Sequence, residues 1–140
     1  MFCTEGIQNF ETLVLMQVFI AIYLGILFLQ SGFDKIIDWK GNRNWLTGHF
    51  EKSVLRHQVP VMLFILTVLE VLAGLCCAGG VVAVILSGCS YWIFLGFVLS
   101  ASALLCLFFG QRMAKDYAGA SSLSNYFMIV LIGLYLFTIS

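Results

Sequence analysis

The chain consists of long apolar stretches separated by short segments that carry almost all of its charges. Residues 13–32 form the first stretch, and residues 59–110 form a second whose only charged member is Glu70. A third covers residues 123–139. Because a helix needs about 20 apolar residues to cross a bilayer core, each stretch is a candidate for at least one membrane crossing.

The middle stretch is too long for a single crossing, since a helix rises about 1.5 Å per residue. It must therefore fold back, and the segments "AGG" (78–80) and "SGCS" (87–90) are the candidate turns. Pro60 suits the first turn of a helix, where its missing N–H costs nothing. We predict an all-α, four-helix transmembrane bundle in a single domain, residues 1–140, with helices near 13–33, 60–78, 90–109 and 123–139.

Composition supports lipid as the solvent of this chain. Apolar residues make up 61% of its 140 positions and charged residues 10%, whereas soluble domains are about 45–50% apolar. A soluble protein of this size would have too little core to hide so many apolar side chains. The net charge is zero and no nucleic-acid motif is present, so we expect no nucleic-acid partner.

The basic residues predict an orientation. All seven fall in the segments after the first and third predicted helices: Lys35, Lys40, Arg43, Lys52 and Arg56, then Arg112 and Lys115. Four crossings place these two segments on the same side of the membrane. Because cytoplasmic loops carry an excess of Lys and Arg, we expect both segments in the cytoplasm and both termini on the outer side.

The segment between the first two predicted helices has an amphipathic pattern of its own. In "NRNWLTGHFEKSVLRHQVP" (42–60), Leu46, Phe50 and Val54 recur every four residues, which is the spacing of one apolar helix face. We predict an interfacial helix that rests in the headgroup layer. His49 and His57 are interpreted as interfacial residues, because no third metal ligand is evident.

Glu70 is the polar residue that most requires an explanation. An ionised carboxyl within a membrane costs a few kcal/mol, so Glu70 should face the bundle interior and be neutral or paired. One interpretation is a hydrogen-bonded carboxyl that fixes helix packing; the other is a ligand-binding or proton-handling group. The predicted partner is Gln17, followed by Tyr23 and Tyr135, and Ser100 completes the candidate polar site.

Small residues form stripes on three of the predicted helices, and such stripes let neighbouring backbones approach closely in membranes. We expect Gly32 to lie at one of these close contacts. The stripes comprise Gln17, Ala21, Gly25 and Gly32, then Ala73, Gly74 and Cys77 beside Glu70, and finally Gly96, Ser100 and Ala103.

The five cysteines show no CxxC motif and no metal-ligand spacing. An odd count argues against a full disulfide framework, and buried cysteine usually behaves as a small apolar residue. On the predicted topology Cys3, Cys76, Cys77 and Cys89 lie towards the outer side, where one disulfide can form. We assign no metal site and no catalytic residue.

Two motifs resemble the DoxX family of small membrane proteins. The first-helix signature of that family, G-x-x-F-x-x-x-G-x-x-K, is carried here by Gly25, Phe28, Gly32 and Lys35. Its second helix opens near a proline and carries a glutamate followed by small residues, and "VLEVLAG" with Glu70 and Gly74 is similar to that pattern. Residues 110–127 resemble a segment of a bacterial subgroup, so the resemblance covers nearly the whole chain.

The resemblance implies a multi-pass protein of the bacterial inner membrane that serves as an accessory or anchoring subunit of a membrane complex, without catalytic activity of its own. Relatives are linked to quinone-dependent redox systems, so a quinone is the one candidate cofactor. The implied partners are membrane lipids and either other subunits or further copies of the chain. Two alternatives stay open: a small transporter-like bundle that binds a ligand or handles protons through Glu70, and a purely structural subunit.

Overall fold

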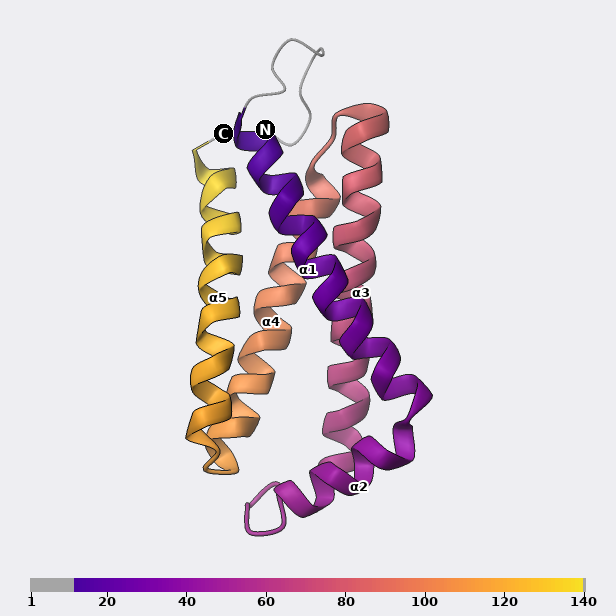
Figure 1. Ribbon diagram of the computed structural model, residues 1–140, viewed down its shortest axis with the longest axis vertical. Coiled ribbons are helices and arrows are strands. Elements are labelled where there is room, and N and C mark those ends of the chain that lie inside the picture. Colours follow the sequence, from indigo (N-terminus) through magenta and orange to yellow (C-terminus); the bar gives the residue numbers. More distant parts are fainter. Residues whose placement is uncertain (1–11, 140) are drawn as a thin grey trace.

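The computed structural model describes residues 12–139, which form four long helices and one short helix that lies across one end (Figure 1). The helices are α1 Thr12–Ile37, α2 Trp39–His49, α3 Val59–Ser87, α4 Tyr91–Met113 and α5 Tyr117–Thr138. The four long ones are each long and apolar enough to cross a membrane. The predicted all-α, four-helix bundle is therefore confirmed.

The long helices pack in the order α1, α3, α4, α5. α3 contacts both α1 and α4, and α4 contacts α5. α1 crosses in front of the bundle on a diagonal, from a start beside the end of α5 to an end beside the first half of α3 (Figure 1). Thr12 and Thr138 thus lie at one end of the bundle, and α2 lies at the opposite end.

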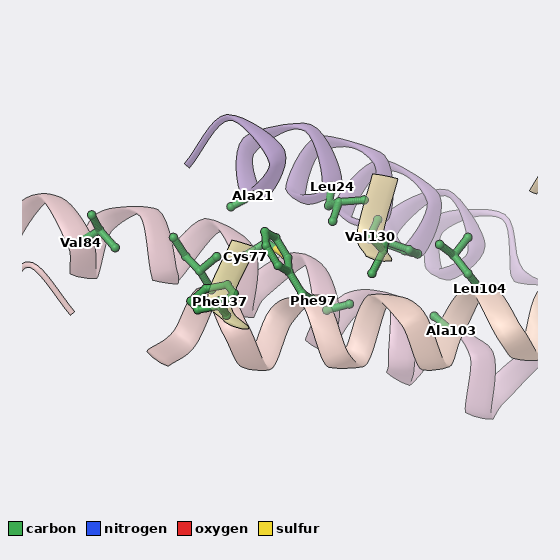
Figure 2. Packing of buried hydrophobic residues seen from close by; sticks show 12 residues of the cluster. Ala21, Leu24, Cys77, Val84, Phe97, Ala103, Leu104, Val130 and Phe137 are labelled. Atoms are coloured by element: carbon green, nitrogen blue, oxygen red, sulfur yellow. The ribbon is translucent and has the colours of Figure 1, made fainter. Parts of the chain in front are cut away.

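The centre of the bundle is filled by apolar side chains from all four long helices (Figure 2). Phe97 of α4 meets Phe137 of α5 edge to face, with ring centroids 5.8 Å apart, a favoured geometry for aromatic pairs. Large side chains such as Phe19, Ile26 and Phe64 point outward and are exposed. This arrangement suits a protein that contacts lipid on its outer faces.

Glycines set the closest helix contacts, as the small-residue stripes predict. A Cβ atom on Gly32 would lie 2.6 Å from Cγ2 of Val71, and one on Gly96 would lie 2.7 Å from Sγ of Cys77. The expected position of Gly32 at a close contact of α1 with α3 is therefore confirmed. The other stripe residues are also buried: Gln17, Ala21, Gly25, Ala73, Gly74, Cys77, Ser100 and Ala103.

The second membrane helix is longer than predicted, because α3 continues to Ser87 rather than ending near residue 78. Gly79 and Gly80 lie inside it, and the turn occurs at Gly88, whose φ of 74° is left-handed. A Cβ on Gly80 would lie 2.6 Å from the backbone nitrogen of Ile93. The "AGG" segment is therefore a close contact with α4 and not a turn. The helix continues through it because an interrupted helix in lipid would leave backbone groups unpaired.

The segment between α1 and α3 contains the predicted helix, but with other bounds. α2 follows α1 directly, and the carboxylate of its N-cap Asp38 accepts a hydrogen bond from the backbone N–H of Gly41 at 3.3 Å. The helix ends at His49, so Val54 lies beyond it and is 77% exposed. Phe50 is buried, close to Gly110 of α4. The single apolar face over residues 46–54 is therefore wrong.

Candidate polar site and adjoining cavity

Glu70 is paired with a cation inside the bundle. Its side chain is 1% exposed, and Oε2 lies 2.9 Å from Nζ of Lys35. The hydroxyl of Ser31 donates to the same oxygen at 3.1 Å, and Lys35 Nζ donates to Ser31 Oγ at 2.8 Å. These three side chains are called the Ser31–Lys35–Glu70 cluster below. Of the two expected states of Glu70, neutral or paired, the structure has the paired one.

Local geometry explains how the cluster assembles from α1 and α3. Ser31 and Lys35 are four residues apart on α1, so their side chains share one face of the helix. Gly32 lies beside Ser31 and packs against Val71, the neighbour of Glu70. The missing side chain at Gly32 thus lets α3 come near enough for Glu70 to reach both partners.

The cluster balances the charges that the fold buries. A lone carboxylate in an apolar interior is strongly unfavourable, and a paired one is tolerated only when further hydrogen bonds satisfy it. Glu70 has both a cation and a hydroxyl donor. Lys35 lies in the last turn of α1, where a positive charge interacts favourably with the helix dipole. The cluster therefore links α1 to α3 through a carboxylate whose charge and hydrogen bonds are satisfied.

The structure does not join the predicted site residues to one another. Gln17 is buried, but it lies fourteen positions before Ser31 on α1, about 21 Å along the helix axis. Tyr23 and Tyr135 are exposed. Gln17 and both tyrosines are therefore wrong as partners of Glu70.

Ser100 is fully buried on α4, and its hydroxyl donates to the carbonyl of Gly96 one turn earlier at 2.7 Å. This bond lies within its own helix and does not involve Glu70. A ligand-binding role for Gln17 or Ser100 stays a prediction.

Sequence reasoning missed the role of Ser31 and Lys35 as the partners of Glu70. In the sequence, Ser31 is only a polar member of the first apolar stretch, and Lys35 is only a basic residue at a motif position. The signal that was available is the spacing of the two on either side of Gly32. A donor pair that flanks a close-contact glycine lies on the face that meets the neighbouring helix.

A cavity of about 200 Å³ lies next to the cluster, between α2, α3 and α4. Lys35 lines it and is the member of the cluster that reaches it, with 15% of its side chain exposed. Most of the other walls are apolar and come from Leu63, Leu66 and Leu107, with Trp45 on the α2 side. Asn42, His49 and Gln111 also line the cavity, but Asn42 donates to the carbonyl of Asp38 and the other two side chains meet each other. The cavity thus combines mainly apolar walls with one ammonium group.

His49 ties α2 over this cavity. Its Nε2 lies 2.8 Å from Oε1 of Gln111 at the end of α4 and 3.7 Å from Oδ2 of Asp116, the N-cap of α5. Its ring stacks on Trp45 with centroids 4.6 Å apart. The side chain of His49 therefore connects α2 to the α4–α5 turn.

Cys106 is the cysteine that lines the cavity. Within residues 12–139, no three His, Cys, Asp or Glu side chains are grouped so that they can hold a metal ion. Cys76, Cys77 and Cys106 are free thiols, whereas Cys89 is disulfide-bonded. Cys3, which is predicted to lie towards the outer side with Cys76, Cys77 and Cys89, is outside the described residues.

Comparison with known proteins adds no relative. No family model, no curated protein and no solved structure matches this chain. The four apolar spans by themselves make it an integral, multi-pass membrane protein whose outer faces contact lipid.

Proposed function

We propose that this protein is a DoxX-like accessory or anchoring subunit of a membrane complex, linked to quinone-dependent redox chemistry. The observation that carries the proposal is the Ser31–Lys35–Glu70 cluster. The two sequence motifs that resemble DoxX meet at this cluster. Lys35 of the first motif pairs with Glu70 of the second, and Gly32 packs beside them on α1. The motif residues thus act as one structural unit that holds two membrane helices together.

The state of Glu70 favours an accessory role over proton transport. A proton carrier exchanges its proton along a path of water or other titratable groups. Glu70 itself is only 1% exposed, and a lysine and a serine hold the same carboxylate oxygen in place. Such a carboxylate holds α1 and α3 together. The exposed apolar faces of the long helices offer surface for lipid or for partner helices.

The proposed location is the bacterial inner membrane, with the α2 end in the cytoplasm and the termini outside. Two observations support this orientation. All seven basic residues lie at the α2 end, as the positive-inside rule requires of a cytoplasmic face. The disulfide-bonded Cys89 lies in the turn at the opposite end, and disulfides form in oxidising compartments.

Cysteine labelling tests the orientation. In a background without accessible thiols, a cysteine at Arg43 or Arg112 should react with a membrane-impermeant maleimide only after the cells are opened. Labelling of either position from outside intact cells would overturn the proposed topology.

Copurification tests the role as a subunit. The tagged chain is extracted at native expression levels in a gentle detergent, and the recovered proteins are identified by mass spectrometry. A larger redox protein recovered in fixed ratio supports the proposal. Recovery of the chain alone, as a monomer or as copies of itself, contradicts it.

A second candidate function is a bundle that binds a ligand or handles protons through Glu70. The observation in its favour is the cavity, which places Lys35 beside both Glu70 and an open space. Glu70→Gln retains hydrogen bonding but cannot carry charge, whereas Glu70→Leu loses both. Normal assembly of Glu70→Gln together with a lost phenotype favours this candidate. If Glu70→Gln retains both assembly and phenotype while Glu70→Leu loses both of them, Glu70 serves packing alone.

A further inference from the structure

The cavity between α2, α3 and α4 has the features of a small-molecule site. We infer that it binds a compact, neutral, planar ring that bears a carbonyl oxygen, with that oxygen directed at Lys35. The inference deepens the proposed function and rests on its quinone link for the natural identity of the ligand. Binding itself is argued from the size, the lining and the charge of the cavity.

Size and lining select a small ring. An apolar cavity of about 150 Å³ accepts benzene, so the volume here, about 200 Å³, suits a six-membered ring with small substituents. Leu63, Leu66 and Leu107 supply apolar walls, and the indole of Trp45 lies on the α2 side. Ligand sites commonly combine such walls with a few placed polar groups.

The donor for the ligand is the ammonium group of Lys35, which has three N–H groups. Two of them meet Ser31 Oγ at 2.8 Å and Glu70 Oε2 at 2.9 Å. The remaining contact, with the carbonyl of Ser31, is 3.5 Å long, which is beyond the usual range for a hydrogen bond. One N–H of Lys35 is therefore left for an acceptor in the cavity.

Charge selects a neutral ligand over an anion. Glu70 already neutralises Lys35 at 2.9 Å, so a bound carboxylate would add an uncompensated negative charge to an apolar chamber, at considerable cost. A carbonyl oxygen accepts the same hydrogen bond and carries no net charge. The paired lysine thus serves as a donor without attracting anions.

Three probes separate these features, each added to the purified full chain in detergent. Duroquinone is a tetramethyl benzoquinone with no free ring position for thiol addition. Durene is the matching tetramethyl ring without oxygens, and benzoate carries an anionic oxygen. Duroquinone should raise the unfolding midpoint, followed by circular dichroism, by at least about 2 °C near saturation. Durene and benzoate at the same concentration should raise it by less than half as much.

A pair of matched glycine variants locates the binding. Gly110 lines the cavity, and a Cβ there would meet only Phe50, at 3.4 Å, so Gly110→Leu should fill the space and abolish the shift. Gly79→Leu adds the same side chain to a helix at a place where nothing lies within 4 Å, and it should keep the shift.

The role of the ammonium group is tested by the double variant Lys35→Met with Glu70→Gln. It removes both charges together and so leaves no unpaired ion. It should fold and bind duroquinone no better than durene.

Several outcomes would overturn the inference. Equal shifts with durene and duroquinone would show an apolar chamber without a donor, and a larger shift with benzoate would contradict the charge argument. A duroquinone shift that survives in Gly110→Leu would place binding elsewhere. These measurements use the isolated chain, so they can fail while a partner protein still copurifies, or succeed when none does. A failure of this inference is therefore distinguishable from a failure of the proposed function.

Discussion

Two substitutions that each remove one charge of the buried ion pair should have unequal effects. Lys35→Met leaves Glu70 without its cation, and Glu70→Gln leaves Lys35 without its anion. The structure makes these two situations different, because the carboxylate is 1% exposed and the lysine side chain is 15% exposed and reaches the cavity. The lysine can therefore find another environment for its charge, whereas the glutamate cannot.

The expected magnitudes follow from this difference. Removing one partner of a buried pair costs about 3–5 kcal/mol when the other charge stays buried, so Lys35→Met should lower the free energy of unfolding by about 3 kcal/mol or more. In Glu70→Gln the amide oxygen still accepts from Ser31 and the lysine retains Ser31 Oγ at 2.8 Å. Its expected loss is about 1–2 kcal/mol. The double variant should also lose only about 1–2 kcal/mol, because no unpaired charge remains.

The measurement is reversible unfolding in mixed micelles with a rising fraction of SDS, followed by helical circular dichroism. Lys40→Met is the matched control, since Lys40 is exposed on α2 and its loss should change stability by about 0.5 kcal/mol at most. Additive losses in the double variant, or a larger loss for Glu70→Gln than for Lys35→Met, would refute the reasoning.

Two further predictions concern glycines. Gly32→Leu should lower the free energy of unfolding by about 2–3 kcal/mol, because even its Cβ would lie 2.6 Å from Cγ2 of Val71; the same unfolding assay applies. Gly79→Leu, in open space, is its control, and wild-type stability for Gly32→Leu would contradict the packing argument. Gly88→Ala should lower stability by about 1–2 kcal/mol, because its φ of 74° is costly for a residue with a Cβ. An unchanged unfolding curve for Gly88→Ala would mean that the turn rearranges freely.

The apolar pattern alone determined that the chain crosses a membrane four times, and the small-residue stripes indicated which helix faces meet. Both properties are local, because a span depends on about 20 consecutive residues and a stripe on helical periodicity. Pro60, predicted in the first turn of the second membrane helix, lies there in α3. The gathering of all basic residues at one end also follows from their order along the chain.

Helix ends were less predictable, because the same residue types serve different purposes in lipid and in water. Gly79 and Gly80 would commonly mark a turn in a soluble chain. In this bundle α3 continues through them, since Gly80 is needed for close contact with Ile93 of α4 and a break in lipid would expose unpaired backbone groups. Only the neighbouring helix makes that distinction.

The partner of Glu70 was decided by the tertiary structure alone. The sequence identified Glu70 as a buried group that needs a partner. It predicted Gln17, which lies on the correct helix but too far along its axis from Glu70. Which residue of α1 meets Glu70 depends on the axial register of two antiparallel helices, and the contact of Gly32 with Val71 sets that register. A shift of a few residues along a uniformly apolar helix changes little in hydropathy, so the pattern alone cannot choose between Gln17 and the pair of Ser31 and Lys35.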